Sequence, residues 1–463
     1  MKKKLVSLVM AAAMAASVAA LPAFAGETEA AVDPSQDSGE IYMFIASPEY
    51  ADAINTLIDD YKKVAPNVTI NYETTQNDYP TLLKAKINSG DVPDIFSSTS
   101  GKEIDTYLEY SLDLSDQPLM NTIDPGVASA MASAKEGGGM YGIAIKGNYF
   151  GMIYNEDVLK DAGVDKVPET TEELKAACDK IKSAGYTPFT TGFMEWWVYK
   201  HVAQHFVDAA AKAAGISAAD LVASIQKGEK SLKDYPIACD NFFDFIDYVV
   251  KNGDDKPLET DLAGEEQAFA SGKVAFMLGQ GAWVEADLKK INPDLKIGFA
   301  GYPVDDKAED AQVISGSDQA LRINKDSKNL QAVLNFINWW YTSDEGQAWF
   351  TDVAGVVPPV KSDKASDFVI IEQGKKLAEE KGSGELAIVD STDSFHQVFG
   401  EAMQSYIAGT TSKEDTIKTI DEQCAAIDGP NAQEIYRKVF QLPQMPQTGP
   451  MPVCGLTDSY VRM

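Results

Sequence analysis

From residue 41 onward, short apolar segments of strand length alternate with amphipathic stretches of helical period, and this alternation most limits the choice of fold. Residues 41–45 form an apolar run, after which Ser47 and Pro48 supply a helix cap and a first-turn proline. Apolar side chains then recur at helical spacing from Ile54 to Val64, and residues 68–73 alternate as a strand does. Because strands joined by helices form crossover connections, we predict an α/β fold with parallel sheets.

The same alternation continues to about residue 341. We predict further strands at 94–96, 151–154, 274–278 and 320–323, and helices at 78–88, 171–184 and 330–341. A chain of 463 residues exceeds the roughly 100 to 200 residues of a typical domain. We therefore expect more than one lobe.

The two ends of the chain differ from this pattern. Three lysines, an apolar run at 5–21 and a small-x-small site ending at Ala25 predict a signal peptide at 1–25, cleaved after Ala25. The apolar run is shorter than the ~20 residues of a comfortable membrane span, which favours cleavage over a retained anchor. The acidic stretch 26–40 predicts a flexible linker, and the breaker-rich stretch 428–463 predicts an irregular tail.

The chain is strongly acidic, with 40 Lys and Arg against 70 Asp and Glu. Such a surface repels phosphate backbones and anionic lipids, so we expect neither nucleic acid nor a membrane surface as a partner. The four cysteines lack metal-type spacing, and we expect free thiols. His201 and His205 are spaced i, i+4, but no third ligand is evident, so we interpret them as solvated helix residues and expect no metal or cofactor.

Five blocks, in order, carry a family resemblance. They are SGDVPDI (89–95), YGI (141–143) with GMIYNEDVL (151–159), FASGKVAFM (269–277) with GAW (281–283), INKDSKN (323–329), and TSDEGQ (342–347) with GVVPP (355–359). Together they resemble the extracellular solute-binding proteins of carbohydrate ABC importers, the maltose-binding-protein-like family 1. The resemblance covers about residues 41–426.

The resemblance implies a two-lobed periplasmic-binding-protein-like fold of type II, with hinged lobes that each hold a mainly parallel sheet flanked by helices. We expect one lobe from 41–145 and 296–343, and the other from 146–295 and 344–427. The implied function is capture of an oligosaccharide or other sugar in the interlobe cleft and delivery to the membrane permease of an ABC transporter, by a monomeric receptor that is not an enzyme. The family's Gram-positive members usually carry a lipobox cysteine, whereas this chain has none before Cys178, so we expect an exported protein without a lipid anchor.

A sugar cleft needs aromatic platforms for apolar ring faces and planar polar groups for paired hydroxyls. Trp283 follows a predicted strand and a glycine-rich turn, which favours a position at the cleft mouth. Glu195, Trp196 and Trp197 follow a strand-to-helix turn, so we expect at least one indole to face the ligand. Trp339, Trp340 and Trp349 belong to amphipathic helical segments and are expected in the core.

The remaining candidates are mostly polar. Asp318 and Gln319 precede a predicted strand, where the resemblance implies bonds to sugar hydroxyls. Ser47 and Ser98 follow strands, at the carboxyl ends where α/β proteins bind ligands. Further candidates are Asp78, which could instead cap a helix, Tyr149, which could instead pack at the hinge, and Phe395 and His396, where the resemblance implies an aromatic contact.

Two other functions stay open. Glycoside hydrolases also line their clefts with carboxylates and aromatic rings, although no catalytic motif accompanies the carboxylates here. A receptor for polyamines or other cations would suit the acidic composition and an aromatic cage. Incubation with labelled oligosaccharides tests for hydrolysis, and titration with sugars and polyamines side by side tests for the cation receptor.

Overall fold

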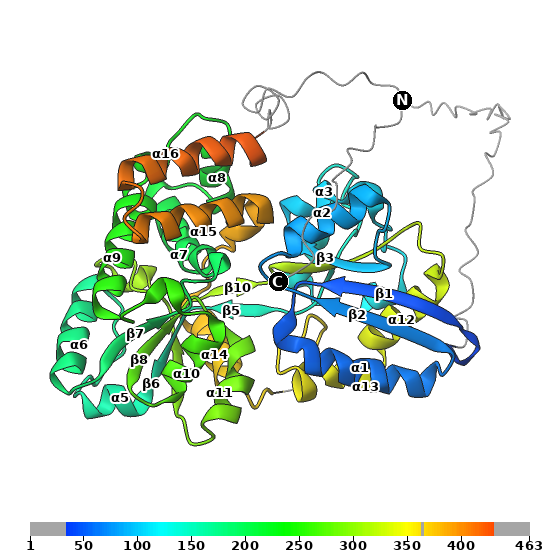
Figure 1. The fold of residues 1–463 in the computed structure, drawn as a ribbon, viewed down its shortest axis with the longest axis horizontal. Helices are drawn as coiled ribbons and strands as arrows, with labels where there is room; N and C mark the ends of the chain where they lie inside the picture. The colour runs from blue at the N-terminus through cyan, green and yellow to red at the C-terminus, as the bar shows by residue number, and fades with distance from the viewer. Residues whose placement is uncertain (1–33, 363–364, 430–463) are drawn as a thin grey trace, which may run out of the picture.

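The protein folds into two α/β lobes that lie side by side (Figure 1). The fold was obtained as a computed structural model, which describes residues 34–362 and 365–429. The predicted signal peptide 1–25 and the tail from 430 lie outside the described residues.

The first lobe is built on a five-stranded sheet in the order β2-β1-β3-β11-β4. Its strands are β1 (Gly39–Ile45), β2 (Val68–Thr74), β3 (Ile95–Thr99), β4 (Ile143–Ala144) and β11 (Gln319–Ile323). Its helices are α1 (Ala51–Val64), α2 (Tyr79–Ser89), α3 (Lys102–Thr106), α4 (Pro125–Ala128), α12 (Leu330–Thr342) and α13 (Asp344–Ala348). The apolar stripe of α1 is buried at Ile54, Leu57 and Tyr61, as its period predicts.

The second lobe is built on a four-stranded sheet in the order β7-β8-β6-β9. Its strands are β6 (Met152–Asn155), β7 (Thr187–Thr191), β8 (Val274–Leu278) and β9 (Ile297–Ala300). Its helices are α5 (Glu156–Asp161), α6 (Thr171–Ser183), α7 (Trp196–Ala214), α8 (Ala218–Gln226), α9 (Phe242–Asn252), α10 (Leu262–Ala270), α11 (Glu285–Ile291), α14 (Val369–Lys381), α15 (Asp393–Ile407) and α16 (Lys413–Gln423). Helices α7, α8, α15 and α16 pack together on this lobe (Figure 1).

A short antiparallel pair joins the lobes. Strand β5 (Asn148–Phe150) pairs with β10 (Ile314–Gly316), and both run between the two large sheets in Figure 1. Gly147, just before β5, also bridges Val357. The segments that connect the lobes therefore lie beside one another, which is the arrangement of a hinge.

Both large sheets are mixed, which corrects the expectation of mainly parallel sheets. In the first lobe β1 pairs in parallel with β2 and β3, but β11 enters antiparallel between β3 and β4. In the second lobe only β7 and β8 are parallel, and β6 is antiparallel to both β8 and β9. The antiparallel strands directly follow or precede hinge segments, so their direction is set by where the chain enters each lobe.

The division of the chain between lobes also differs from the expected one. Strand β9 was expected in the first lobe, but it hydrogen-bonds to β6 in the second. All of 344–427 was expected in the second lobe, but its first part lies on the other lobe, where α13 packs on α12 and the Trp349 indole donates to the Ala53 carbonyl of α1. These boundaries depend on pairing and burial between distant segments, which local patterns do not encode.

The described end of the predicted linker, residues 34–40, has regular structure and side-chain contacts. A short helical turn, η1, covers Pro34–Gln36, and the Asp37 carboxylate accepts a hydrogen bond of 2.7 Å from Asn335. Strand β1 then starts at Gly39. The last part of 26–40 is thus tied to α12 rather than free.

The expected core tryptophans are buried or half-buried. Trp340 and Trp349 are packed edge to face with ring centroids 4.9 Å apart, and Trp339 packs against Tyr61. Cys178, Cys239 and Cys424 are buried free thiols. Over the described ranges, no helix combines the length and apolar character needed to cross a membrane.

Candidate functional site

A cavity of about 370 Å³ lies between the lobes, next to the hinge. It is lined by the ends of β1 and β3 and the start of α2 on the first lobe, and by the starts of α7, α10 and α15 on the second. Its polar and aromatic lining comprises Glu49, Gln76, Tyr79, Ser97, Ser98, Thr99, Lys146, Asn148, Glu195, Trp196, Trp197, Lys200, His201, Asp261, Glu266, Trp283, Asp287, Asp318, Gln319 and Asp393. We call this cavity the interlobe cleft.

Most of the residues predicted as ligand contacts line this cleft. They are Ser98, Glu195, Trp196, Trp197, Trp283, Asp318 and Gln319. Ser47 lies directly beneath, because its fully buried hydroxyl donates to the Gln319 side chain at 2.8 Å. The strand ends and strand-to-helix turns that suggested these positions are the elements that form the cleft walls.

The other four candidates lie outside the cleft lining. Asp78 is exposed at the start of α2, although its side chain makes no capping bond. Tyr149 is half-buried and packs against Gly374 of α14, next to the hinge. Phe395 and His396 line a separate, largely apolar cavity between α7, α8 and α15. Asp393, in the same segment, is the residue that reaches the cleft.

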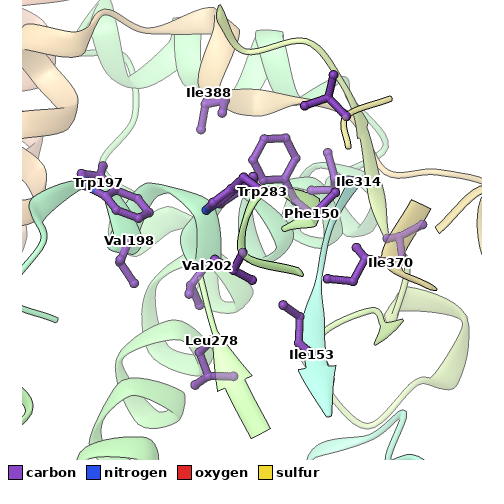
Figure 2. Packing of buried hydrophobic residues seen from close by; sticks show 14 of the residues in the cluster. Phe150, Ile153, Trp197, Val198, Val202, Leu278, Trp283, Ile314, Ile370 and Ile388 are labelled. Carbon is purple, nitrogen blue, oxygen red and sulfur yellow. The ribbon is translucent and has the colours of Figure 1, made fainter. Parts of the chain in front are cut away.

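Trp283 stands at the junction of cleft and hinge. Its ring contacts Phe150 of β5 and His201 of α7, with ring centroids 6.0 Å and 5.5 Å apart, and Figure 2 shows it beside Phe150. Its indole N–H donates to Gln280 at 2.9 Å. The side chain is only 8% exposed, so most of the ring packs against protein and a small part faces the cleft.

The first turn of α7 presents three groups with unmet hydrogen-bonding capacity. The Trp196 and Trp197 indole nitrogens and one Glu195 carboxylate oxygen are buried without a partner among the described residues. All three side chains are at most 9% exposed and all line the cleft. A buried polar group without a partner is costly, so these groups call for a ligand or ordered water in the cleft.

Sequence reasoning missed the two lysines of the cleft. The Lys146 ammonium lies 4.6 Å from the Tyr50 ring centroid and forms an ion pair of 3.3 Å with Glu49. The Lys200 ammonium pairs with Asp393 at 3.3 Å. Burial opposes ionisation of Asp393, but the neighbouring Lys200 ammonium holds the pKa of this carboxyl below the usual range.

Lys200 could have been found from the sequence. It follows Trp196 by four residues, a spacing that places both on one helix face. The same spacing relates His201 to Trp197. Lys146 and Asp393 carry no comparable local signal.

The cleft is rich in carboxylates beyond those paired with lysine. Glu266 of α10 is 9% exposed and its pKa is raised to about 7, mainly by burial and then by the neighbouring Asp287 carboxylate. The Asp318 carboxylate accepts a hydrogen bond of 2.8 Å from Asn148. The net charge of the lining is therefore negative.

The histidines of α7 are buried, which corrects the interpretation of them as solvated residues. His201 and His205 bond through Nδ1 to the carbonyls of Gly279 and Gln312, at 2.9 Å and 3.2 Å. Burial lowers the pKa of each to about 3, so both are neutral at physiological pH. Within residues 34–362 and 365–429, no group of three His, Cys, Asp or Glu side chains is placed to hold a metal ion.

Two lobes around a hinge, with a polar and tryptophan-lined cleft between them, define a bilobal solute-binding protein. Residues 56–377 match the family profile described as bacterial extracellular solute-binding protein. The chain belongs to this family, since the match covers more than half of it.

Relatives and solved structures agree with this assignment. The multiple sugar-binding protein of Streptococcus mutans is 26% identical over 343 residues, covering 72% of this chain and 78% of that protein. The melibiose/raffinose/stachyose-binding protein MelE of Bacillus subtilis is 23% identical, covering 68% and 73%.

The fold matches that of solved structures. A sugar transporter of Bacillus licheniformis, solved with stachyose, superposes with a TM-score of 0.69 at 20% identity, covering 83% of this chain and 99% of that one. The solute-binding protein RafE, solved with raffinose, also gives 0.69, at 18% identity and with coverages of 85% and 100%. The fold is therefore the type II solute-binding fold.

Proposed function

We propose that this protein captures an oligosaccharide in the interlobe cleft and delivers it to the permease of an ABC importer. The observation that carries the proposal is the set of unpartnered indole N–H groups of Trp196 and Trp197, buried in a polar cavity beside the hinge. The names of its relatives support a sugar as the solute: a multiple sugar-binding protein and a melibiose, raffinose and stachyose-binding protein.

The chemistry of the cleft suits a sugar. Ring oxygens and hydroxyls accept hydrogen bonds from the indole N–H groups, and the carboxylates of Glu195 and Asp318 accept hydrogen bonds from sugar hydroxyls. The aromatic faces of Trp197 and Trp283 pack against the apolar faces of the rings. A ligand that contacts both lobes stabilises the closed state, which the permease then recognises.

Two measurements test this function. Calorimetric titration with raffinose, stachyose and a panel of other neutral oligosaccharides should give a saturable heat for at least one of them. Solution scattering with that sugar should give a smaller radius of gyration than without it. Superimposable profiles at saturation would contradict capture by lobe closure.

We also propose binding without turnover. A glycosidase needs a carboxylic acid of raised pKa near a second carboxylate, and Glu266 beside Asp287 meets that description, so turnover is tested directly. Incubation with the bound sugar, followed by chromatography, should recover it unchanged. If hydrolysis products form with the native protein but not with Glu266→Gln, the protein is an enzyme and not a receptor.

The cellular setting completes the proposal. We infer an exported monomer with its signal removed after Ala25 and with no lipid attached. The intact mass of the protein from its native envelope tests this directly, because a retained signal or a diacylglycerol adduct adds a known mass.

A further inference from the structure

The charges in the cleft do not balance. Among the described residues that line it, the ammonium groups are those of Lys146 and Lys200, and each is already paired with a carboxylate, Glu49 and Asp393 respectively. Other carboxylates line the same cavity without a lysine from the lining. A neutral ligand would leave this excess negative charge enclosed when the lobes close, and enclosing unpaired charge is unfavourable.

The excess is concentrated on one wall. The Met194 N–H donates to the Thr260 carbonyl at 3.1 Å, which holds the turn before α7 against the start of α10. Glu195, Asp261 and Glu266 therefore lie on the same side of the cleft. We call these three carboxylates, together with the adjoining Asp287 of α11, the acidic wall.

The acidic wall is largely unpartnered. One oxygen of Glu195 is buried without a hydrogen bond, and the environment of the Glu266 carboxylate within the described part of the chain consists of burial and neighbouring charges without a hydrogen bond. Asp261 accepts a bond from the Gly264 N–H at the start of α10, and Asp287 pairs with Lys290 at the surface. The wall therefore offers hydrogen-bond acceptors that no side chain of the cleft satisfies.

The two indoles beside the acidic wall lack hydrogen-bond acceptors, whereas the wall lacks donors. Trp196 and Trp197 are 7% and 5% exposed, and their N–H groups have no acceptor among the described residues. The ligand must therefore supply acceptors to the indoles and donors to the wall. This pair of requirements is independent of the charge count.

The two requirements select a chemical class. A divalent cation is disfavoured, because the carboxylates in the described ranges do not converge as a metal site requires. A polyamine supplies donors and positive charge but no acceptor for the indole N–H groups. An oligosaccharide with protonated amino groups supplies ammonium donors, hydroxyl acceptors and apolar ring faces.

We propose that the preferred ligand is an amino-sugar oligosaccharide whose ammonium group binds the acidic wall at Glu195 and Glu266. This inference rests on the proposed sugar-binding function and narrows it to a cationic sugar. The ammonium group donates to both carboxylates, and the negative charge of the enclosed cleft falls accordingly. Charge-assisted hydrogen bonds of this kind are stronger than neutral ones.

The environment of Glu266 agrees with this assignment. Burial and the carboxylates of Asp287, Asp261 and Glu49 raise its pKa to about 7, and Lys290 acts in the other direction. A bound ammonium stabilises the ionised form, so binding should displace the fraction of protons that Glu266 holds near neutral pH. Calorimetry in buffers of different ionisation enthalpy measures this proton release.

The test uses trisaccharides that differ at one substituent. The full chain is titrated near neutral pH with the β-1,4-linked trimers of glucosamine, N-acetylglucosamine and glucose, and with raffinose and spermidine. One ammonium placed against the wall should strengthen binding by about 10- to 100-fold, so the glucosamine trimer should bind at least about tenfold more tightly than either neutral trimer. In Glu266→Gln this preference should shrink to about threefold or less, whereas the exposed Glu172→Gln on α6 should retain it.

The outcomes separate the two proposals. If a neutral trimer or raffinose binds as tightly as the glucosamine trimer, or if Glu266→Gln keeps the full preference, the amino-sugar inference is overturned and sugar binding stands. If spermidine binds and no sugar does, both proposals fail in favour of a polyamine receptor. If none of the five compounds binds, the amino-sugar inference is overturned, and the wider panel of neutral oligosaccharides decides the sugar-binding proposal.

Discussion

Replacement of Trp283 by alanine tests whether this side chain contributes both to ligand binding in the cleft and to packing against the hinge. The indole is 8% exposed, contacts Phe150 and His201, and donates to Gln280. Deleting a buried aromatic side chain costs about 3 to 5 kcal/mol of unfolding free energy. The lost ring face should also weaken sugar binding by roughly 2 to 4 kcal/mol, which is about 30- to 1000-fold in affinity.

This expectation differs from the one that the sequence suggests. A tryptophan in an open cleft would lose affinity with little change in stability, whereas the observed burial predicts that both fall. The assay is calorimetric titration with the bound sugar, paired with urea unfolding of the ligand-free protein. Trp339→Ala is the matched control, because Trp339 packs against Tyr61 in the first lobe and should lower stability alone.

The result that would refute this reasoning is specific. If Trp283→Ala keeps its affinity while its unfolding free energy drops, the indole is only a core residue. If the unfolding free energy is unchanged, the Trp283 ring does not pack tightly against Phe150.

Three further predictions concern buried groups and lobe contact. Burial raises the pKa of Glu265 well above its usual range, so the unfolding free energy should fall as pH rises above about 4.5, where only the unfolded chain releases the proton. Urea unfolding at several pH values should show a smaller fall for Glu265→Gln than for the native protein. Parallel pH profiles of the two proteins would contradict this prediction. Burial lowers the pKa of His205 to about 3, so stability should fall as pH drops below about 6.5, and His205→Gln should lessen this slope unless the histidine is solvated. A Cβ on Gly101, which has φ +66°, would lie 2.3 Å from the Val389 carbonyl of the other lobe; Gly101→Ala should therefore weaken sugar binding at least about tenfold and enlarge the complex in solution scattering, and unchanged values for both would show that the lobes do not close on this contact.

Local sequence patterns predicted most helices and strands because the residues that form and end these elements lie within or next to them in the sequence. The predicted strand 274–278 coincides with β8, where all five side chains are buried. The predicted start of the helix at Thr171 is right because the Thr170 hydroxyl caps it by accepting the Glu173 N–H. Strand β9 was assigned to the wrong lobe, since only its pairing with β6 decides its place.

The cleft was partly predictable for the same reason. Trp196, Trp197 and Trp283 follow strands directly, so their positions at the cleft follow from chain direction. Asp393 could not be chosen over Phe395 and His396, because the orientation of α15 depends on its packing against α7. That packing puts Phe395 and His396 against the apolar cavity behind the helix.

The contacts between the two lobes determine how much of the free energy of lobe closure the ligand must supply. Outside the cleft, Lys84 of α2 bonds to Ser394 of α15, and Lys102 of α3 bonds to the Asp428 carbonyl. Lys84 and Ser394 form an exposed polar contact, and such contacts are worth little, so they bias the equilibrium weakly. The ligand must then supply most of the free energy difference between open and closed states, which equals its difference in affinity for the two. Because the acidic wall lines the cleft between the lobes, the charge of the ligand acts on this difference directly. A cationic sugar therefore stabilises the closed state more than a neutral sugar of the same shape does.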